Sequence, residues 1–101
     1  DPTAHAVLLT LRAAAAKIGT RRLPEATIFT TLEPCAMCVG ALVEARVRAL
    51  VYAVPDPERG AAGSLLQLAQ EPRLSHRLAV VSGVREAEAR RMLAEVPSAS
   101  V

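Results

Sequence analysis

Apolar residues recur along the chain first with a helical spacing and then in short continuous runs. In residues 3–18, Val7 and Leu11 lie on one stripe of a predicted helix. Gly19 follows where a C-terminal helix cap belongs. Residues 26–32 are rich in Thr and Ile, which is typical of a β-strand. The chain is therefore expected to open with a helix followed by a strand.

The rest of the chain continues this alternation. Pro34 favours the start of a second helix, because its missing N–H costs nothing in the first helical turn. The further expected elements are a helix over 35–45, a buried strand over 49–54, a short helix over 64–70 capped by Ser64, a strand over 78–81 and a helix over 85–96. Glycines in 60–63 predict a flexible loop, and residues 97–101 a frayed end. Such alternation predicts an α/β fold with parallel strands.

Composition and charge restrict the function only weakly. The chain has 101 residues, of which 51% are hydrophobic, with one Phe, one Tyr and no Trp, so we expect a single domain over 1–101. Its net charge of +2 neither requires nor excludes a nucleic-acid partner. No apolar run is as long as a membrane span, so we expect no membrane partner. Because the chain begins at Asp1 and not at Met, we expect a piece of a longer protein.

Three residues are candidate metal ligands. His5 stands at the start of the first predicted helix, and Cys35 and Cys38 stand at the start of the second. One imidazole and two thiolates suit Zn²⁺ with a fourth position left open, which is the pattern of catalytic zinc sites. The two cysteines alone are a weak signal, since they are also compatible with a redox pair or with an inert pair of small buried residues. Their close spacing is not a disulfide framework, which favours a reducing compartment and most simply the cytoplasm.

These residues resemble the zinc-dependent nucleobase deaminases. The signature of that superfamily is His-x-Glu followed by Pro-Cys-x-x-Cys, which corresponds here to residues 5–7 and 34–38. Within the superfamily, the chain is most similar to the bacterial tRNA adenosine deaminases. The segments that carry this similarity are residues 1–6, 31–38, 50–52, 56–57, 60–66 and 82–84.

The resemblance implies a fold and an activity. The family's fold is a three-layer α/β/α, cytidine-deaminase-like arrangement with a mixed or parallel sheet. Its N-terminal helix and two strands would be missing before Asp1. The family's activity is the zinc-dependent hydrolytic deamination of the wobble adenosine to inosine in the anticodon loop of tRNA. The resemblance also implies a cytoplasmic homodimer that has no membrane partner.

The same resemblance assigns roles to individual residues. It implies that zinc is bound by His5, Cys35 and Cys38. Contacts to the substrate would come from Ala6, Pro34 and Asp56. The alternatives are that the first two of these only shape helix starts and that the third caps a loop.

The chain departs from the signature at Val7, where the family has a Glu that moves protons during the reaction. A positioned acid–base group contributes about 10²–10⁴-fold to the rate, and Val carries no proton. We therefore expect a chain that binds zinc but deaminates very poorly or not at all. Glu33 is the nearest other carboxylate in sequence, and we do not expect it to substitute. Two alternatives remain open: a non-catalytic zinc-binding subunit that docks RNA or a partner deaminase, and a deaminase of free cytosine or guanine bases or nucleosides.

Overall fold

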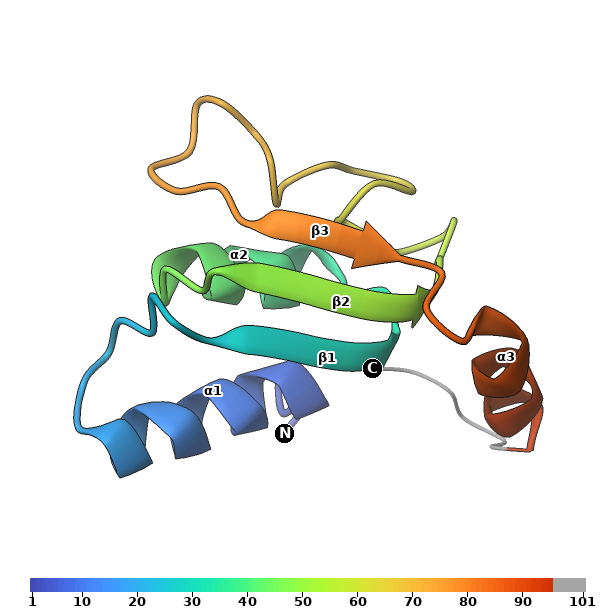
Figure 1. Cartoon of the computed structure of the whole chain (residues 1–101), viewed down its shortest axis with the longest axis horizontal. Helices are drawn as coiled ribbons and strands as arrows, with labels where there is room; N and C mark the ends of the chain where they lie inside the picture. Colours follow the sequence, from blue (N-terminus) through green and yellow to red (C-terminus); the bar gives the residue numbers. More distant parts are fainter. Residues whose placement is uncertain (96–101) are drawn as a thin grey trace.

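The computed structural model describes residues 1–95, and it confirms the predicted α/β class. The elements, in chain order, are α1 (Ala6–Ile18), β1 (Thr27–Leu32), α2 (Ala36–Glu44), β2 (Ala49–Val54), β3 (Ala79–Ser82) and α3 (Glu86–Ala94) (Figure 1). The expected frayed end at 97–101 and the last residue of the predicted helix 85–96 lie outside the described residues.

The first helix begins at Ala6 and not at Thr3 as predicted, because the side chain of Asp1 accepts hydrogen bonds from Thr3 and holds it in a turn. The Asp1 carboxylate accepts hydrogen bonds from the Thr3 amide at 2.9 Å and from the Thr3 hydroxyl at 2.7 Å. His5 is still extended, so the helix starts at Ala6. At the other end, Gly19 has the left-handed conformation of a helix cap, with φ of 82°, as the sequence predicts.

The strands form one sheet in the order β1-β2-β3, and both neighbouring pairs are parallel. Phe29 of β1 is paired with Val51 of β2, which is paired in turn with Val81 of β3. Parallel neighbours require a crossover between them. Helix α2 makes the first crossover, and residues 55–78 make the second without any helix.

The predicted helix over 64–70 is therefore wrong. The backbone there forms turns and an isolated antiparallel bridge between Ala62 and Gln67. Ser64 does not cap a helix, because both its amide and its hydroxyl donate to the carboxylate of Glu33. The expected flexible loop at 60–63 differs as well, since Gly60 and the two alanines after it are buried.

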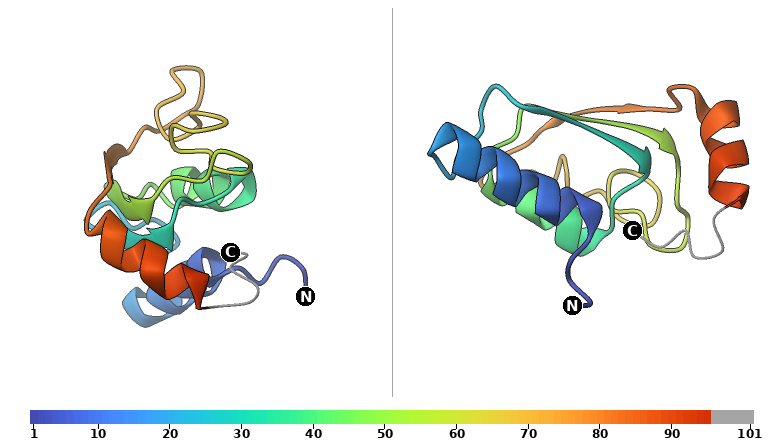
Figure 2. Two further views of the ribbon diagram at one scale, coloured as in Figure 1. Left: turned by 90° about the vertical axis from the view of Figure 1, so that its right-hand side faces the viewer. Right: turned by 90° about the horizontal axis from the view of Figure 1, so that it is seen from below.

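One face of the sheet carries most of the core. Helices α1 and α2 lie side by side on it, whereas α3 lies beyond the carboxyl ends of the strands (Figures 1 and 2). The face against α1 and α2 buries Leu50 of β2 and Leu42 of α2 completely. On the opposite face Phe29 is 74% exposed and Val81 is 49% exposed. Within the described part of the chain, no helix is long and apolar enough to cross a membrane.

Candidate metal centre

The predicted ligands His5, Cys35 and Cys38 lie together where α1 and α2 begin. His5 and Cys35 are the extended residues just before these helices, and Cys38 lies in the first turn of α2. Nδ1 of His5 is 3.3 Å from Sγ of Cys38 and 3.6 Å from Sγ of Cys35. The three donor atoms all lie within 4.8 Å of one another. Folding thus brings residues that are thirty positions apart in sequence into one cluster.

This donor set fits a zinc ion. Tetrahedral zinc with bonds of about 2.0–2.3 Å places neighbouring nitrogen and sulfur donors about 3.5 Å apart, close to the distances from His5 to the two sulfurs. Both cysteines are free thiols. Two sulfurs and one imidazole occupy three positions of a tetrahedron and leave the fourth for water or substrate.

Burial makes the Cys38 thiol reluctant to ionise without a cation. Cys38 is fully buried and Cys35 is 6% exposed. Burial and the neighbouring Cys35 raise the pKa of the Cys38 thiol to about 12, and the positive charge of Arg59 acts in the opposite direction. Because thiolates are the ligand form, zinc must displace this proton on binding. The start of α2 favours the thiolate further through its partial positive charge.

A cavity of about 410 Å³ lies beside the cluster, and His5 and Cys35 form part of its wall. The remaining lining residues come from both helix starts and from the 55–78 crossover: Pro2, Ala36, Met37, Glu58, Arg59, Leu65 and Leu66. The cavity is therefore lined both by two of the candidate ligands, His5 and Cys35, and by residues of the crossover.

The predicted substrate contacts Ala6, Pro34 and Asp56 are not among the lining residues. Ala6 is exposed and Pro34 is fully buried. The Asp56 carboxylate accepts hydrogen bonds from the amides of Glu58 and Arg59, at 3.1 and 3.2 Å. This is the loop-capping role that the sequence left open for Asp56.

Val7 belongs to the core and does not line the cavity. It is 6% exposed and packs in one apolar cluster with Leu11 and the two cysteines. The aliphatic side chain present at position 7 can therefore neither accept nor donate a proton beside the cluster.

Glu33 is the residue whose role the sequence analysis missed. It is fully buried, and its carboxylate accepts hydrogen bonds from the amides of Asp56, Ala62 and Ser64 and from the Ser64 hydroxyl. Burial alone would raise the pKa of this carboxyl, but these hydrogen bonds outweigh it and hold the pKa below its ordinary value. Both carboxylate oxygens of Glu33 thus accept hydrogen bonds from residues 56–64, and Glu33 does not line the cavity. The available signal was one acidic residue between apolar Leu32 and Pro34.

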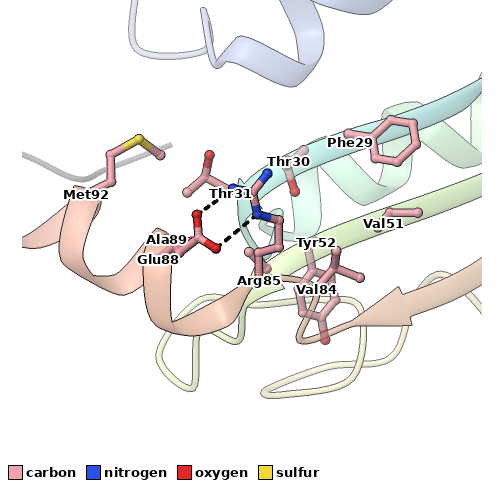
Figure 3. A pocket seen from close by; sticks show the side chains of 11 residues that line it. Phe29, Thr30, Thr31, Val51, Tyr52, Val84, Arg85, Glu88, Ala89 and Met92 are labelled. Carbon is pink, nitrogen blue, oxygen red and sulfur yellow. Dashed lines mark hydrogen bonds and ion pairs between the residues drawn. The ribbon is translucent and has the colours of Figure 1, made fainter.

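A larger cavity, of about 530 Å³, lies on the open side of the sheet, and none of its lining residues is shared with the smaller cavity. Figure 3 shows Phe29 and Val51 of the sheet facing it, with Met92 and the ion pair between Arg85 and Glu88 contributed by α3 and the turn before it. None of the candidate ligands lines it, whereas His5 and Cys35 line the smaller cavity.

Most of this chain matches a deaminase family model and proteins that are named as deaminases. The model of the MafB19-like deaminase family matches residues 1–92. The tRNA-specific adenosine deaminase of Bacillus subtilis is 48% identical over 90 residues, which are 89% of this chain and 56% of that protein. A tRNA(Ile)-lysidine synthase of Deinococcus radiodurans is 46% identical over 96 residues, which are 95% of this chain but only 16% of that protein.

Solved structures show the same relationship. One from a study of A-to-I editing by tRNA:A34 deaminases superposes with a TM-score of 0.87 at 41% identity, covering 92% of this chain and 67% of that one. A guanine deaminase of Nitrosomonas europaea superposes with a TM-score of 0.70 at 29% identity, covering 91% and 56%. The chain spans about half the length of the curated adenosine deaminases it matches. With residues 1–92 matched and the three candidate ligands gathered in one cluster, the chain belongs to the MafB19-like deaminase family.

Proposed function

We propose that His5, Cys35 and Cys38 bind one Zn²⁺ and that the cavity beside them is a deaminase site. The observation that carries this proposal is the convergence of one imidazole and two thiols at zinc-like spacing. When bound, zinc supplies the activation of water for attack on an amino-substituted ring carbon. The chain's own residues hold the ion at the start of two helices and wall the space in which a base would sit.

The proposed substrate is the wobble adenosine in the anticodon loop of a tRNA. Support comes from the relatives, since several of those that match most of this chain are named tRNA-specific adenosine deaminases. Arg59 at the cavity wall offers a positive charge for a phosphate group. The homodimer and the cytoplasmic location remain predictions of the same resemblance.

We further propose that the activity of this chain is impaired at the proton-transfer step. Val7 is aliphatic and buried in the core, and both carboxylate oxygens of Glu33 are occupied by hydrogen bonds. Zinc binding does not need a proton carrier, whereas turnover does. The same observation supports the second candidate, a zinc-binding subunit that docks RNA or a partner deaminase without reacting.

A third candidate is a deaminase of a free base. The structural likeness to a guanine deaminase at 29% identity supports it, as does a cavity of about 410 Å³, which is large enough for a purine. The match to the guanine deaminase is weaker than the match to the tRNA:A34 deaminase structure, so we rank the free base below the tRNA substrate.

The test begins with the zinc content of the purified chain, measured before and after mild oxidation. One zinc per chain that resists oxidation is the expected result, and a disulfide in place of the metal would support the redox pair instead. The same protein is then titrated with an anticodon stem-loop RNA and, separately, with guanine. Binding of the RNA alone supports the tRNA substrate, and binding of guanine alone supports the free-base deaminase.

A further inference from the structure

We propose that Glu33 is a positioning residue whose buried carboxylate holds residues 56–64 in the shape that forms one wall of the metal-site cavity. Glu33 does not line that cavity itself. It acts through the segment, and only the RNA readout of the test below rests on the proposed function.

The contacts of Glu33 use both oxygens completely. Oε1 accepts the Asp56 amide at 2.9 Å and the Ser64 hydroxyl. Oε2 accepts the amides of Ala62 at 2.9 Å and Ser64 at 3.1 Å. Glu33 is fully buried and its hydrogen bond with the Ala62 amide is buried as well, so leaving that amide without an acceptor would be costly. One carboxylate therefore fastens both ends of the segment.

The middle of the segment is fastened to the start of α2. The Ala61 amide donates to the carbonyl of Pro34 at 2.9 Å, and Gly60 forms an isolated antiparallel bridge with Cys35. A Cβ built on Gly60 would lie 2.3 Å from Cδ of Glu33, so the backbone approaches the carboxylate as closely as only glycine permits. The position of the segment relative to the metal ligand Cys35 thus depends on the space and charge of Glu33.

Two exposed residues of the segment, Glu58 and Arg59, line the cavity. They line the same cavity as His5, and in sequence they lie between the Asp56 and Ser64 anchors. These two side chains carry the charges that a substrate would meet at that wall. Loss of the Glu33 carboxylate should therefore disorder the substrate side of the site.

The metal side should survive the same change. The ligands sit at the starts of α1 and α2, and α2 is held by fully buried Val39 and Leu42. Among the described residues, the donors to the Glu33 carboxylate all lie in 56–64, and neither Val39 nor Leu42 is one of them. If Glu33 is a positioning residue, its loss should disorder residues 56–64 and leave metal binding intact. If its role is to stabilise the whole fold, its loss should abolish both.

The experiment compares Glu33→Gln with Glu44→Gln, a matched change at an exposed residue of α2. Gln keeps the shape of Glu but turns an amino group toward backbone N–H donors. The first readout is hydrogen exchange of the amides of 56–64 against those of α2, and the second is the zinc-to-protein ratio. The third is the dissociation constant for an anticodon stem-loop RNA. Ser64→Ala, which keeps the carboxylate and removes one donor, serves as a milder second variant.

For Glu33→Gln we expect exchange in 56–64 to become about 10- to 100-fold faster, with α2 unchanged. Zinc should remain at one per chain, and the RNA dissociation constant should rise about tenfold. Ser64→Ala should move the same readouts less, and Glu44→Gln should move none. Unchanged exchange in 56–64 would overturn the proposal, and so would zinc loss together with faster exchange in α2. If even the unmodified chain fails to bind RNA, the proposed function fails, while exchange and zinc content still decide the role of Glu33.

Discussion

Replacing Val7 with Glu tests most directly why this chain should bind metal and yet turn over poorly. The change restores a carboxylate at the position where the deaminase signature has one. Val7→Gln is the matched control, because Gln has the size and polarity of Glu but no proton to transfer at neutral pH.

Two opposing effects set the expected magnitude. A positioned acid–base group accelerates a reaction by about 10²–10⁴-fold, which lowers the barrier by roughly 2.7–5.5 kcal/mol. Against this, position 7 is only 6% exposed and packs with Leu11 and the cysteines, so a polar side chain there is desolvated. That desolvation costs about 1–3 kcal/mol of stability, less than the roughly 5–15 kcal/mol of an ordinary domain. The variant should therefore stay folded and gain activity.

The assay is single-turnover conversion of adenosine to inosine in an anticodon stem-loop RNA, followed by digestion and quantification of nucleosides. Zinc content and the melting temperature are measured on the same samples, so that a failure to fold or to bind metal is recognised. We expect Val7→Glu to exceed the unmodified chain by about 10²–10⁴-fold and Val7→Gln to match the unmodified chain. Equal rates for Val7→Glu and the unmodified chain would refute the reasoning, as would an equal gain from Val7→Gln.

Further predictions concern the metal, the crossover and the sheet. Cys38→Ser should weaken zinc binding by more than about 100-fold, measured by competition with a chelator. If the variant still held one zinc per chain as tightly as the unmodified chain, the ligand assignment would be contradicted. Gly60→Ala should lower the free energy of unfolding by about 1–3 kcal/mol, because its Cβ would meet the carboxylate of Glu33 at 2.3 Å. A Cβ at Gly40 would meet nothing within 4 Å, so Gly40→Ala should instead raise that free energy by about 0.5–1 kcal/mol. Equal urea midpoints for the two variants would contradict the close approach of Gly60 to Glu33. Phe29→Thr should reduce self-association, measured as light scattering of concentrated solutions, because this ring is 74% exposed. The free energy of unfolding should change by less than about 0.5 kcal/mol. Unchanged scattering would show that the chain does not self-associate through this ring.

Much of the fold follows from short stretches of sequence. The strand predicted over 49–54 is β2 to the residue, because a continuous apolar run buried in a parallel sheet needs no long-range information to be recognised. The other strands and helices end within a few residues of their predictions. The short helix at 64–70 failed because the local pattern cannot show that Ser64 has an acceptor thirty-one residues earlier in the chain.

The candidate site divides in the same way. The residue types and spacing of His5, Cys35 and Cys38 suffice to predict a metal site, since few ions suit one imidazole and two thiolates. Their mutual distances of 3.3 and 3.6 Å, however, arise only because the sheet brings the starts of two helices together. Glu33 shows the limit most clearly. As a sequence feature it was one acidic residue beside the cysteine motif, and only the packing of the crossover makes it a buried acceptor of four hydrogen bonds. Sequence alone determined which groups can bind the ion, because ligand chemistry belongs to side chains. Tertiary structure decided which groups wall the cavity, because hydrogen bonds between distant segments are chosen only when the whole chain packs.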